Sequence, residues 1–329
     1  MQVMVIGAAG MVGRKLVARL VRDGGLGGRP IETLTLVDVV APVSPEGFSG
    51  QVETITADLS ATGEADKLAH RRPDVIFHLA AVVSGEAEAD FDKGYRINLD
   101  GTRFLFEAIR QEGLRDAYKP RLVFTSSIAV FGAPFPEQIH DEFFSTPLTS
   151  YGTQKAIGEL LLSDYSRRGF FDGIGIRLPT ICVRPGKPNL AASGFFSGIL
   201  REPLAGKEAI LPVSDDVRHW FASPRAAVDF LVQAAAVDTA SLGDRRNISL
   251  PGLSATVGEE IEALRRVGGD KAVKLIRREP DPTIARIVAG WARDFDTRRA
   301  EALGFRAETS FDEIVRAHVE DELGGKVGA

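Results

Sequence analysis

VMVIGAAGMVGRKLVARLVRDG, residues 3–24, joins two kinds of pattern at Gly7. The apolar run before Gly7 is typical of a buried strand, and after it apolar residues recur with the spacing of a helix. Gly7, Gly10 and Gly13 lie where the two patterns meet. The stretch therefore predicts a strand over 3–8, a glycine turn, and a helix over 10–24.

The glycine turn has the features of a phosphate-binding loop. One glycine permits a tight turn, one lets the backbone approach a pyrophosphate, and one lets the helix pack closely on the strand. The helix start then offers free N–H groups and partial positive charge. Glycines also fill ordinary turns, and the spacing of three and three differs from the two and three of the common dehydrogenase fingerprint. The strand–turn–helix context favours a dinucleotide site at Gly7, Gly10, Met11, Val12 and Gly13.

Asp38 ends a second predicted strand, over 33–39. A carboxylate there accepts hydrogen bonds from the adenosine ribose hydroxyls and repels a 2′-phosphate. No Arg or Lys follows it in VDVVAPVSPE, residues 37–46. A turn-forming Asp is the alternative. We therefore predict NAD rather than NADP as the cofactor.

Strands and helices alternate through the first half of the chain. Further strands are predicted over 52–59, 74–81, 121–127 and 173–181, with helical patterns over 64–72, about 90–112 and 150–167. Alternation of this kind indicates a parallel sheet covered on both faces. The predicted fold class is therefore α/β, a Rossmann-type doubly wound parallel sheet with a smaller C-terminal substrate-binding lobe.

The ends of the third and fourth predicted strands carry more candidate cofactor contacts. Small residues there let a flat ring or a sugar approach the sheet, at the edge where open parallel sheets bind ligands. Packing alone also explains each of them. The candidates are Asp58, Leu59, Leu79, Ala80 and Ala81.

The regular pattern stops after Ile181, where VRPGKPNLAASG, residues 183–194, is rich in Pro and Gly. A helical pattern at 223–237 and a strand in RRNISL, residues 245–250, return to the sheet, and helical stretches follow at about 256–267 and 310–322. The predicted domains are an NAD-binding Rossmann domain over 1–181, to which 223–250 returns, and a substrate-binding lobe over 182–222 and 251–329.

The composition is that of a globular protein. The chain has 329 residues, 44% hydrophobic and 26% charged, and a net charge of −5 with interspersed signs gives no reason to expect a nucleic-acid partner. Cys182 is the only cysteine, so no internal disulfide is possible; it lies in an apolar stretch as a core residue or a pocket-lining one. No signal peptide or membrane span of ~20 apolar residues is evident. We expect a cytoplasmic protein without a membrane partner.

LTSYGTQKAIGE, residues 148–159, places Tyr151 and Lys155 on one face of the predicted helix. Oxidation of an alcohol needs a base that is partly ionised at working pH. Tyrosine titrates near ~10. An ammonium about 4 Å away at an effective dielectric near 20 is worth roughly 4 kcal/mol, or about three pKa units. The spacing fits a catalytic acid–base pair, although it also arises by chance.

Several motifs occur in a recognisable order. They are the GxxGxxG turn, the strand-end Asp, LAA, NLDGT (98–102), FTSSIAVFG (124–132) and the Tyr–Lys pair. Together they resemble the extended short-chain dehydrogenase/reductase family, whose best-known members are nucleotide-sugar epimerases. The resemblance covers about residues 1–240. Within the family, the sequence is most similar to dehydrogenases that oxidise a four-carbon sugar acid at C2.

The resemblance implies a role for each motif residue. Tyr151 is then the acid–base, Lys155 holds the nicotinamide ribose and lowers the tyrosine pKa, and Ser127 bonds the reacting oxygen. Further implied cofactor contacts are Asn98, Pro179 and Ile181. The resemblance also implies a homodimer through the helices at about 90–112 and 150–167.

The substrate site is less defined by the sequence. TSSI, residues 125–128, lacks the acidic residue of dehydratases, and VRHWFAS, residues 217–223, keeps only Arg218 of the epimerase pattern. These departures disfavour dehydration and weigh against a nucleotide sugar. Arg218 is either a carboxylate-binding fork or a surface arginine. Ser84, Ser127 and Asn189 are the other candidate substrate contacts.

Three functions stay open. The first is an NAD-dependent dehydrogenase that oxidises the C2 hydroxyl of a small sugar acid. The second is an epimerase that regenerates its bound NAD. The third is a dinucleotide sensor, which needs the glycine turn but not Ser127, Tyr151 and Lys155. No metal is predicted, because His78 lies in an apolar strand, and His140 and Asp141 have no partner at metal-ligand spacing.

Overall fold

The computed structural model describes residues 1–186 and 192–328. The chain forms two compact units, each built from three separate segments. The first unit consists of Met1–Val130, Pro147–Leu178 and Val228–Ser249. The second consists of Phe131–Thr146, Pro179–Ala227 and Leu250–Ala329.

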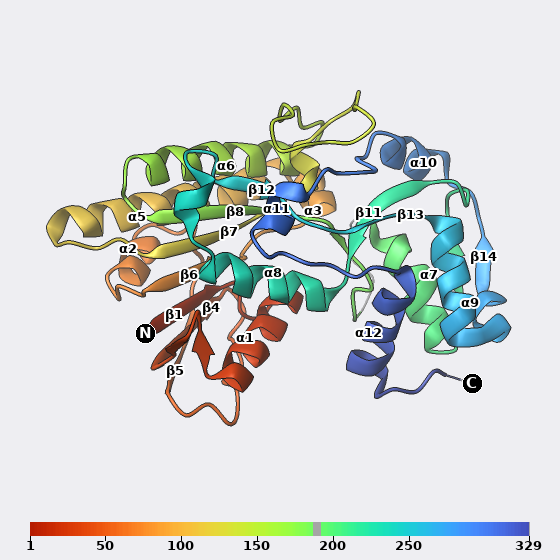
Figure 1. Ribbon diagram of the computed structural model, residues 1–329, viewed down its shortest axis with the longest axis horizontal. Helices are drawn as coiled ribbons and strands as arrows, with labels where there is room; N and C mark the ends of the chain where they lie inside the picture. Colours follow the sequence, from red (N-terminus) through yellow and green to blue (C-terminus); the bar gives the residue numbers. More distant parts are fainter. Residues whose placement is uncertain (187–191, 329) are drawn as a thin grey trace. The chain divides into compact units, whose positions relative to one another are not determined.

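Seven parallel strands form the sheet of the first unit (Figure 1). They lie in the order β12 (Asn247–Ser249), β8 (Asp172–Leu178), β7 (Arg121–Ser127), β6 (Val75–His78), β1 (Gln2–Ile6), β4 (Thr33–Asp38) and β5 (Gln51–Thr56). The chain starts in the middle, builds outward to β5, and then continues on the other side of β1. The point of reversal lies between β1 and β6, and ligands bind at the carboxyl edge of such a point. The predicted fold class is confirmed.

Helices cover both faces of this sheet (Figure 1). One face carries α2 (Glu64–Ala69), α5 (Gly101–Arg115) and α6 (Ser150–Arg167), and the other carries α1 (Met11–Asp23) and the C-terminal part of α8 (Pro224–Ala236). Apolar side chains of α5 and α6, such as Phe106 and Leu162, are fully buried against the sheet. Burial of each is worth about 1.5–3 kcal/mol.

Shorter elements complete the first unit. They are the hairpin of β2 (Gly25–Leu26) and β3 (Arg29–Pro30), the helices α3 (Ser84–Ala89) and α4 (Phe91–Gly94), a π-helical segment (Tyr95–Asp100), and 3₁₀ turns at Ile128–Val130 and Thr239–Leu242. The long helix expected over about 90–112 is therefore helical from 91 to 115, with a π-helical segment in its first half.

The second unit contains two small sheets and several helices. The sheets are β9 (Thr180–Ile181) with β11 (Arg218–Ala222) and β13 (Leu253–Thr256), and β10 (Ala209–Leu211) with β14 (Ile276–Arg278). The helices are α7 (Gly194–Leu204), α9 (Val257–Val273), α10 (Pro282–Ala289), α11 (Arg298–Ala302) and α12 (Phe311–Leu323). Buried aromatic and aliphatic side chains of α7, α9 and α12 form the core of this unit.

One charged residue lies in that apolar core. Glu260 of α9 is completely buried, and neither oxygen of its carboxyl group has a hydrogen-bond partner among the described residues. Burial without a partner disfavours the ionised form and raises the pKa of Glu260 well above its ordinary value. This group therefore stays protonated to higher pH in the folded chain than in the unfolded chain.

Candidate active site

The glycine turn after β1 leaves no room for side chains at Gly7 and Gly13. Gly7 has φ +96°, a region that favours glycine, and a Cβ there would lie 2.7 Å from the backbone nitrogen of Ala80. A Cβ on Gly13 would lie 2.0 Å from the carbonyl oxygen of Gly7. Gly10 is the N-cap of α1, and no side chain caps this helix. The N–H groups of Met11 and Val12, in its first turn, therefore have no side-chain acceptor at the cap.

Asp38 is held next to this turn at the end of β4. Its Oδ2 accepts the N–H of Ala9 at 2.9 Å, and its Oδ1 accepts the N–H of Val40 at 3.2 Å. Arg14 is exposed and donates to the carbonyl oxygen of Ala9 at 2.6 Å. An uncapped helix start, a turn without room for side chains and an oriented carboxylate fit a dinucleotide.

The other predicted strand-end residues lie along the same edge. The N–H groups of Leu79 and Ala80 donate to the carbonyl oxygen of Ile6, and Ala81 follows them. Leu59 is buried, and Asp58 accepts bonds from Ser60.

Asp58 is also paired with a cation, because Nη1 of Arg96 lies 2.9 Å from its Oδ2. Partial burial acts to raise the pKa of Asp58, but the bonds from Ser60 and Arg96 outweigh it and lower the pKa below the ordinary value. This strand-end carboxylate is therefore held ionised.

Asn98 lies in the π-helical segment and is 1% exposed. Its Oδ1 accepts the N–H of Val82 at 2.8 Å, while its Nδ2 donates to Val82 O at 3.1 Å and to Gln154 Oε1 at 2.8 Å. These bonds join the loop after β6 to α6. In the structure Asn98 thus braces the backbone beside Leu79, Ala80 and Ala81.

Ser127 and Tyr151 come from the end of β7 and the start of α6. Ser127 is the last residue of β7, and its Oγ accepts the N–H of Ala129 at 3.2 Å. Tyr151 lies in the first turn of α6, which Thr149 caps by accepting the N–H of Gly152 at 3.1 Å. A Cβ on Gly152 would lie 2.2 Å from the carbonyl oxygen of Ala129. The first turn of α6 therefore packs directly on the turn that follows Ser127.

Lys155 is buried one helical turn beyond Tyr151. Its Nζ donates to the carbonyl oxygen of Thr125 at 2.7 Å and lies 5.8 Å from the centroid of the Tyr151 ring. Burial lowers the pKa of Lys155 to about 8, although the carboxylate of Glu159 acts to raise it. The charged form of Lys155 and the N-terminal end of α6 both favour negative charge on the phenol oxygen.

The remaining predicted residues are spread over the chain. Ser84 starts α3 in the first unit, whereas Pro179, Ile181 and Arg218 belong to the second unit. Asn189 lies outside the described residues. The structure therefore brings together the glycine turn, the strand-end residues and the Ser–Tyr–Lys group within the first unit.

Arg218 already has partners in the second unit. Its Nη1 donates to the carbonyl oxygen of Ser254 at 2.8 Å, and its Nη2 lies 3.3 Å from Oε2 of Glu259. The Arg218 side chain is 39% exposed and that of Glu259 is 56% exposed. An exposed pair of this kind contributes little to stability.

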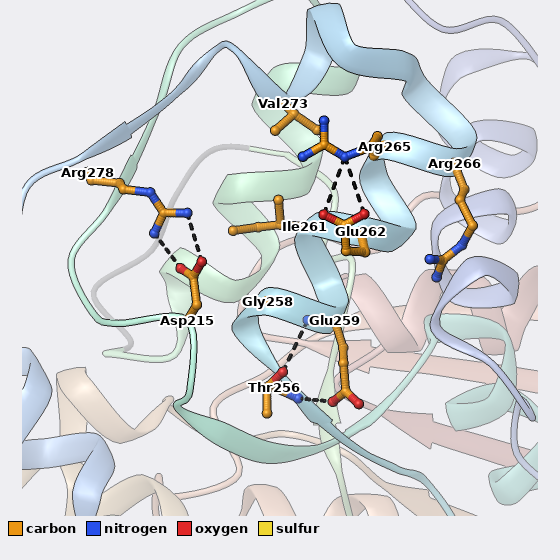
Figure 2. A pocket seen from close by; sticks show the side chains of 10 residues that line it. All are labelled: Asp215, Thr256, Gly258, Glu259, Ile261, Glu262, Arg265, Arg266, Val273 and Arg278. Atoms are coloured by element: carbon orange, nitrogen blue, oxygen red, sulfur yellow. Dashed lines mark hydrogen bonds and ion pairs between the residues drawn. The ribbon is translucent and has the colours of Figure 1, made fainter.

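A surface pocket of about 580 Å³ lies beside α9 in the second unit (Figure 2). Three arginines line it, and each faces a carboxylate. Arg278 pairs with Asp215, Arg265 with Glu262 and Asp270, and Arg266 with Asp312. Because these charges are matched within the protein, the pocket offers no excess positive charge to an anion.

Two residues singled out in the sequence lie in apolar interiors. His78 is buried, its Nε2 lies 2.9 Å from Oγ1 of Thr102, and burial lowers its pKa to about 3. Cys182 is buried in the core of the second unit, and burial raises the pKa of its thiol. Across residues 1–186 and 192–328, no group of three or more His, Cys, Asp or Glu side chains has the arrangement of a metal site. Within the same residues, no helix has the length and apolar character to cross a membrane.

Sequence reasoning missed a buried ion pair beside the Tyr–Lys group, between Glu159 of α6 and Arg177 of β8. A signal for it was present. Arg177 interrupts the otherwise apolar GIGIRLP, residues 173–179, and a charge inside a buried strand needs a partner.

Comparisons with known proteins identify the family. Residues 3–240 match the NAD dependent epimerase/dehydratase family. The chain belongs to this family. The resemblance inferred from the sequence is confirmed, and so is NAD as the cofactor of this enzyme.

Individual family members are similar over nearly the whole chain. The D-erythronate dehydrogenase of Cupriavidus necator is 48% identical over 325 residues, which are 98% of each chain. The D-erythronate dehydrogenase of Haemophilus influenzae is 41% identical over 98% of this chain and 100% of its own. The crystal structure of a nucleoside-diphosphate-sugar epimerase from Agrobacterium tumefaciens has a TM-score of 0.97 and 70% identity, covering 99% of this chain and 95% of that one.

Proposed function

We propose that this family member is an NAD-dependent dehydrogenase that oxidises the C2 hydroxyl of D-erythronate to give 2-dehydro-D-erythronate. The observation that carries the proposal is the placement of Lys155 between the end of β7 and the ring of Tyr151. The substrate class is supported by two relatives, both named D-erythronate dehydrogenase, that align with at least 98% of their own length.

The proposed chemistry divides the hydrogen of the alcohol between two acceptors. Bound NAD would supply the acceptor for the hydride from C2. Tyr151 takes the hydroxyl proton, Ser127 hydrogen-bonds the same oxygen, and Lys155 stabilises the phenolate and binds the nicotinamide ribose. The products are the 2-oxo acid, NADH and one proton released to solvent.

The remaining roles concern binding. The turn Gly7–Gly13 holds the pyrophosphate and Asp38 holds the adenosine ribose. Asp58, Leu59, Leu79, Ala80 and Ala81 line the cofactor site, with Asn98 as a brace and Pro179 and Ile181 beside the nicotinamide. Arg218 binds the substrate carboxylate, with Ser84 and Asn189 as further substrate contacts.

The test follows NADH absorbance with purified protein, NAD and D-erythronate. Tyr151→Phe removes the proton acceptor and keeps the ring, so we expect turnover to fall at least about a hundredfold while NAD still binds. Full turnover in this variant contradicts the proposed acid–base. Two compounds serve as substrate controls. L-Threonate inverts the configuration at C3, and the neutral polyol erythritol lacks the carboxylate.

An epimerase is the second candidate, because the 70%-identical protein from Agrobacterium tumefaciens bears that name. An epimerase returns the hydride to its substrate within one catalytic cycle. It therefore retains NAD during purification and releases no NADH. The epimerase is the correct function if the purified protein retains NAD, converts a nucleotide sugar and does not oxidise D-erythronate.

We also propose a homodimer, located in the cytoplasm. Exposed apolar side chains lie on three helices of the first unit: Phe91 of α4 is 57% exposed, Leu114 of α5 65%, and Leu160 of α6 73%. Pairing of these helices with a second copy covers them. Light scattering on the purified protein measures the mass, and Leu160→Glu is expected to shift it to the monomer. The free thiol of Cys182 suits a reducing compartment.

A further inference from the structure

A buried charged network lies one helical turn beyond the proposed catalytic lysine. Glu159 follows Lys155 on the inner face of α6, and its side chain is 4% exposed. Arg177 of β8 donates from Nε to Oε1 of Glu159 at 2.9 Å and from Nη2 to Oε2 at 2.8 Å. Ser126 of β7 donates from Oγ to the same Oε1 at 2.5 Å. The Glu159 carboxylate therefore binds α6 to two neighbouring strands.

The strand register explains how these groups meet. Ser126 and Arg177 are direct partners across β7 and β8, so both side chains leave the sheet on its α6 face. Thr125 precedes Ser126 and receives the bond from Lys155, whereas Ser127 follows it and is the proposed contact of the reacting oxygen. Two side chains of α6 thus fix the backbone on which Ser127 stands.

The network also balances charge. Lys155 of α6 and Arg177 of β8 are two buried cations on packed elements, and Glu159 is the buried carboxylate on the helix of Lys155 that pairs with Arg177. A buried charge without a partner is strongly unfavourable. Without the carboxylate, the simplest relief is loss of the proton from Lys155, because arginine retains its proton. An uncharged lysine no longer favours the phenolate of Tyr151.

Of the carboxylates on α6, Glu159 is buried and Asp164 is exposed. The elements packed against α6 carry further charged groups: Arg121 of β7, Asp172 of β8, Glu86 and Glu88 of α3, Asp92 and Lys93 of α4, Arg96 and Asp100 of the π-helical segment, and Arg103, Glu107, Arg110, Glu112 and Arg115 of α5. Among their carboxylates, Asp172 pairs with Arg121, Glu86 with Lys93, and Glu112 with Arg72. Glu107 pairs with Arg110 and accepts the hydroxyl of Tyr165, and Glu88 accepts the N–H of Ser150 at the start of α6. His78 of β6 is buried, and burial lowers its pKa to about 3.

We propose that Glu159 is a positioning residue of this active site, which fixes the end of β7 against α6 and keeps Lys155 in its ammonium form. The inference rests on the proposed function, because it gives Lys155 the task of stabilising the Tyr151 phenolate. Glu159 does not touch substrate or cofactor in this account. It acts through Ser126, Arg177 and Lys155.

The first test is Glu159→Gln, which keeps the shape and an acceptor for Ser126 and removes the charge. The carboxylate of Glu159 acts to raise the pKa of Lys155, so its removal favours the neutral lysine, which no longer stabilises the Tyr151 phenolate. We therefore expect the acid limb of the kcat–pH profile to move to higher pH by about one unit. The KM for D-erythronate should stay within about threefold. A purely structural role lowers the melting temperature and leaves the pH limb in place.

A second readout uses protein free of cofactor and substrate. The chain has four tyrosines, so the tyrosinate absorbance of each protein is compared with that of its Tyr151→Phe version. The difference isolates the ionisation of Tyr151, which should also move to higher pH in Glu159→Gln. The double variant Glu159→Gln/Arg177→Gln removes both charges of the pair. It should recover part of the shift, and it supplies a folded protein if the single variant does not fold.

The matched control lies at the other end of the same strands. Arg121 and Asp172 are register partners of β7 and β8, and Arg121 Nη2 lies 2.8 Å from Asp172 Oδ2. Asp172→Asn should lower the melting temperature without moving either titration. If the acid limb of the kcat–pH profile and the ionisation of Tyr151 both stay at their wild-type pH in Glu159→Gln and in the double variant, the inference is wrong. Full turnover in Tyr151→Phe overturns the proposed acid–base role of Tyr151, and absence of NADH formation from D-erythronate in the wild type overturns the proposed function; in both cases the tyrosinate titration still decides whether Glu159 supports the charge.

Discussion

The close packing of Gly13 against the backbone of Gly7 gives the sharpest prediction. In Gly13→Ala the new Cβ would lie 2.0 Å from the carbonyl oxygen of Gly7, and both atoms belong to backbone that cannot rotate away. Cβ atoms essentially never approach another heavy atom within 3.0 Å, so the start of α1 has to move by about 1 Å or more. Overpacking of this kind costs about 1–3 kcal/mol, against a gain of about 1 kcal/mol in helix propensity. We expect a net loss of up to about 2 kcal/mol in the free energy of unfolding.

The larger effect should fall on NAD. The displaced helix start no longer presents its N–H groups at the proposed pyrophosphate site of the turn Gly7–Gly13. A hydrogen bond to a charged group is worth about 1.5–3 kcal/mol, so the loss of one raises the Kd for NAD roughly 10- to 150-fold. Gly198→Ala is the matched control, since Gly198 lies in α7 and its Cβ would meet nothing closer than 3.8 Å.

Two measurements separate fold from affinity. Denaturant unfolding without NAD gives the stability of both variants, and calorimetric titration gives the Kd for NAD. Gly198→Ala should be as stable as the wild type or more so, with an unchanged Kd. If Gly13→Ala binds NAD within threefold of the wild type, the phosphate-binding assignment of this turn is refuted.

Three further predictions follow from single side chains. Asp38→Ala should weaken NAD binding and narrow the preference for NAD over NADP in kcat/KM; an unchanged ratio contradicts the ribose assignment. Arg218→Ala should raise the KM for D-erythronate at least tenfold and leave the KM for NAD nearly unchanged, whereas equal losses for D-erythronate and erythritol show that Arg218 does not bind the carboxylate. Burial raises the pKa of Glu260 in the folded chain above its ordinary value near 4.5. The contribution of Glu260 to the free energy of unfolding is therefore largest below pH ~4.5. It declines by up to about 1.4 kcal/mol per pH unit as the pH rises toward the pKa of the folded chain. Glu260→Gln should therefore gain stability over the wild type as pH rises through that window in denaturant unfolding, while the exposed Glu262→Gln on the same helix should not; parallel pH curves for all three proteins contradict this.

The elements that local pattern determines were predicted closely. The strand expected over 121–127 is Arg121–Ser127 and the helix expected over 150–167 is Ser150–Arg167. In both segments a continuous apolar or amphipathic run has polar residues at its ends, such as the cap Thr149. The strand expected over 74–81 ends at His78, because the N–H groups of Leu79 and Ala80 both donate to the carbonyl oxygen of Ile6 where their backbone lies against Gly7. This strand end depends on residues far away in the sequence.

The second unit and the charged network could not be read in the same way. Short elements such as β10, β14 and α11 have too few residues to be stable alone, and packing in the core of that unit supports them. Glu159 and Arg177 are 18 positions apart and meet only because β8 lies beside β7 under α6. The sequence shows that each charge lies in an apolar segment, whereas the pairing requires the topology.

The interleaved chain path limits how this protein can be rebuilt. Each unit draws on three segments, and the chain passes from one unit to the other at residues 131, 147, 179, 228 and 250. No single truncation releases a complete unit, so a chain cut at any of these points has an unfinished core and is expected to aggregate or be degraded. A chimera that transfers the second unit of a relative has to exchange 131–146, 179–227 and 250–329 together. Directed recombination between relatives therefore has its natural crossovers at these five junctions, because each then exchanges or keeps a whole unit.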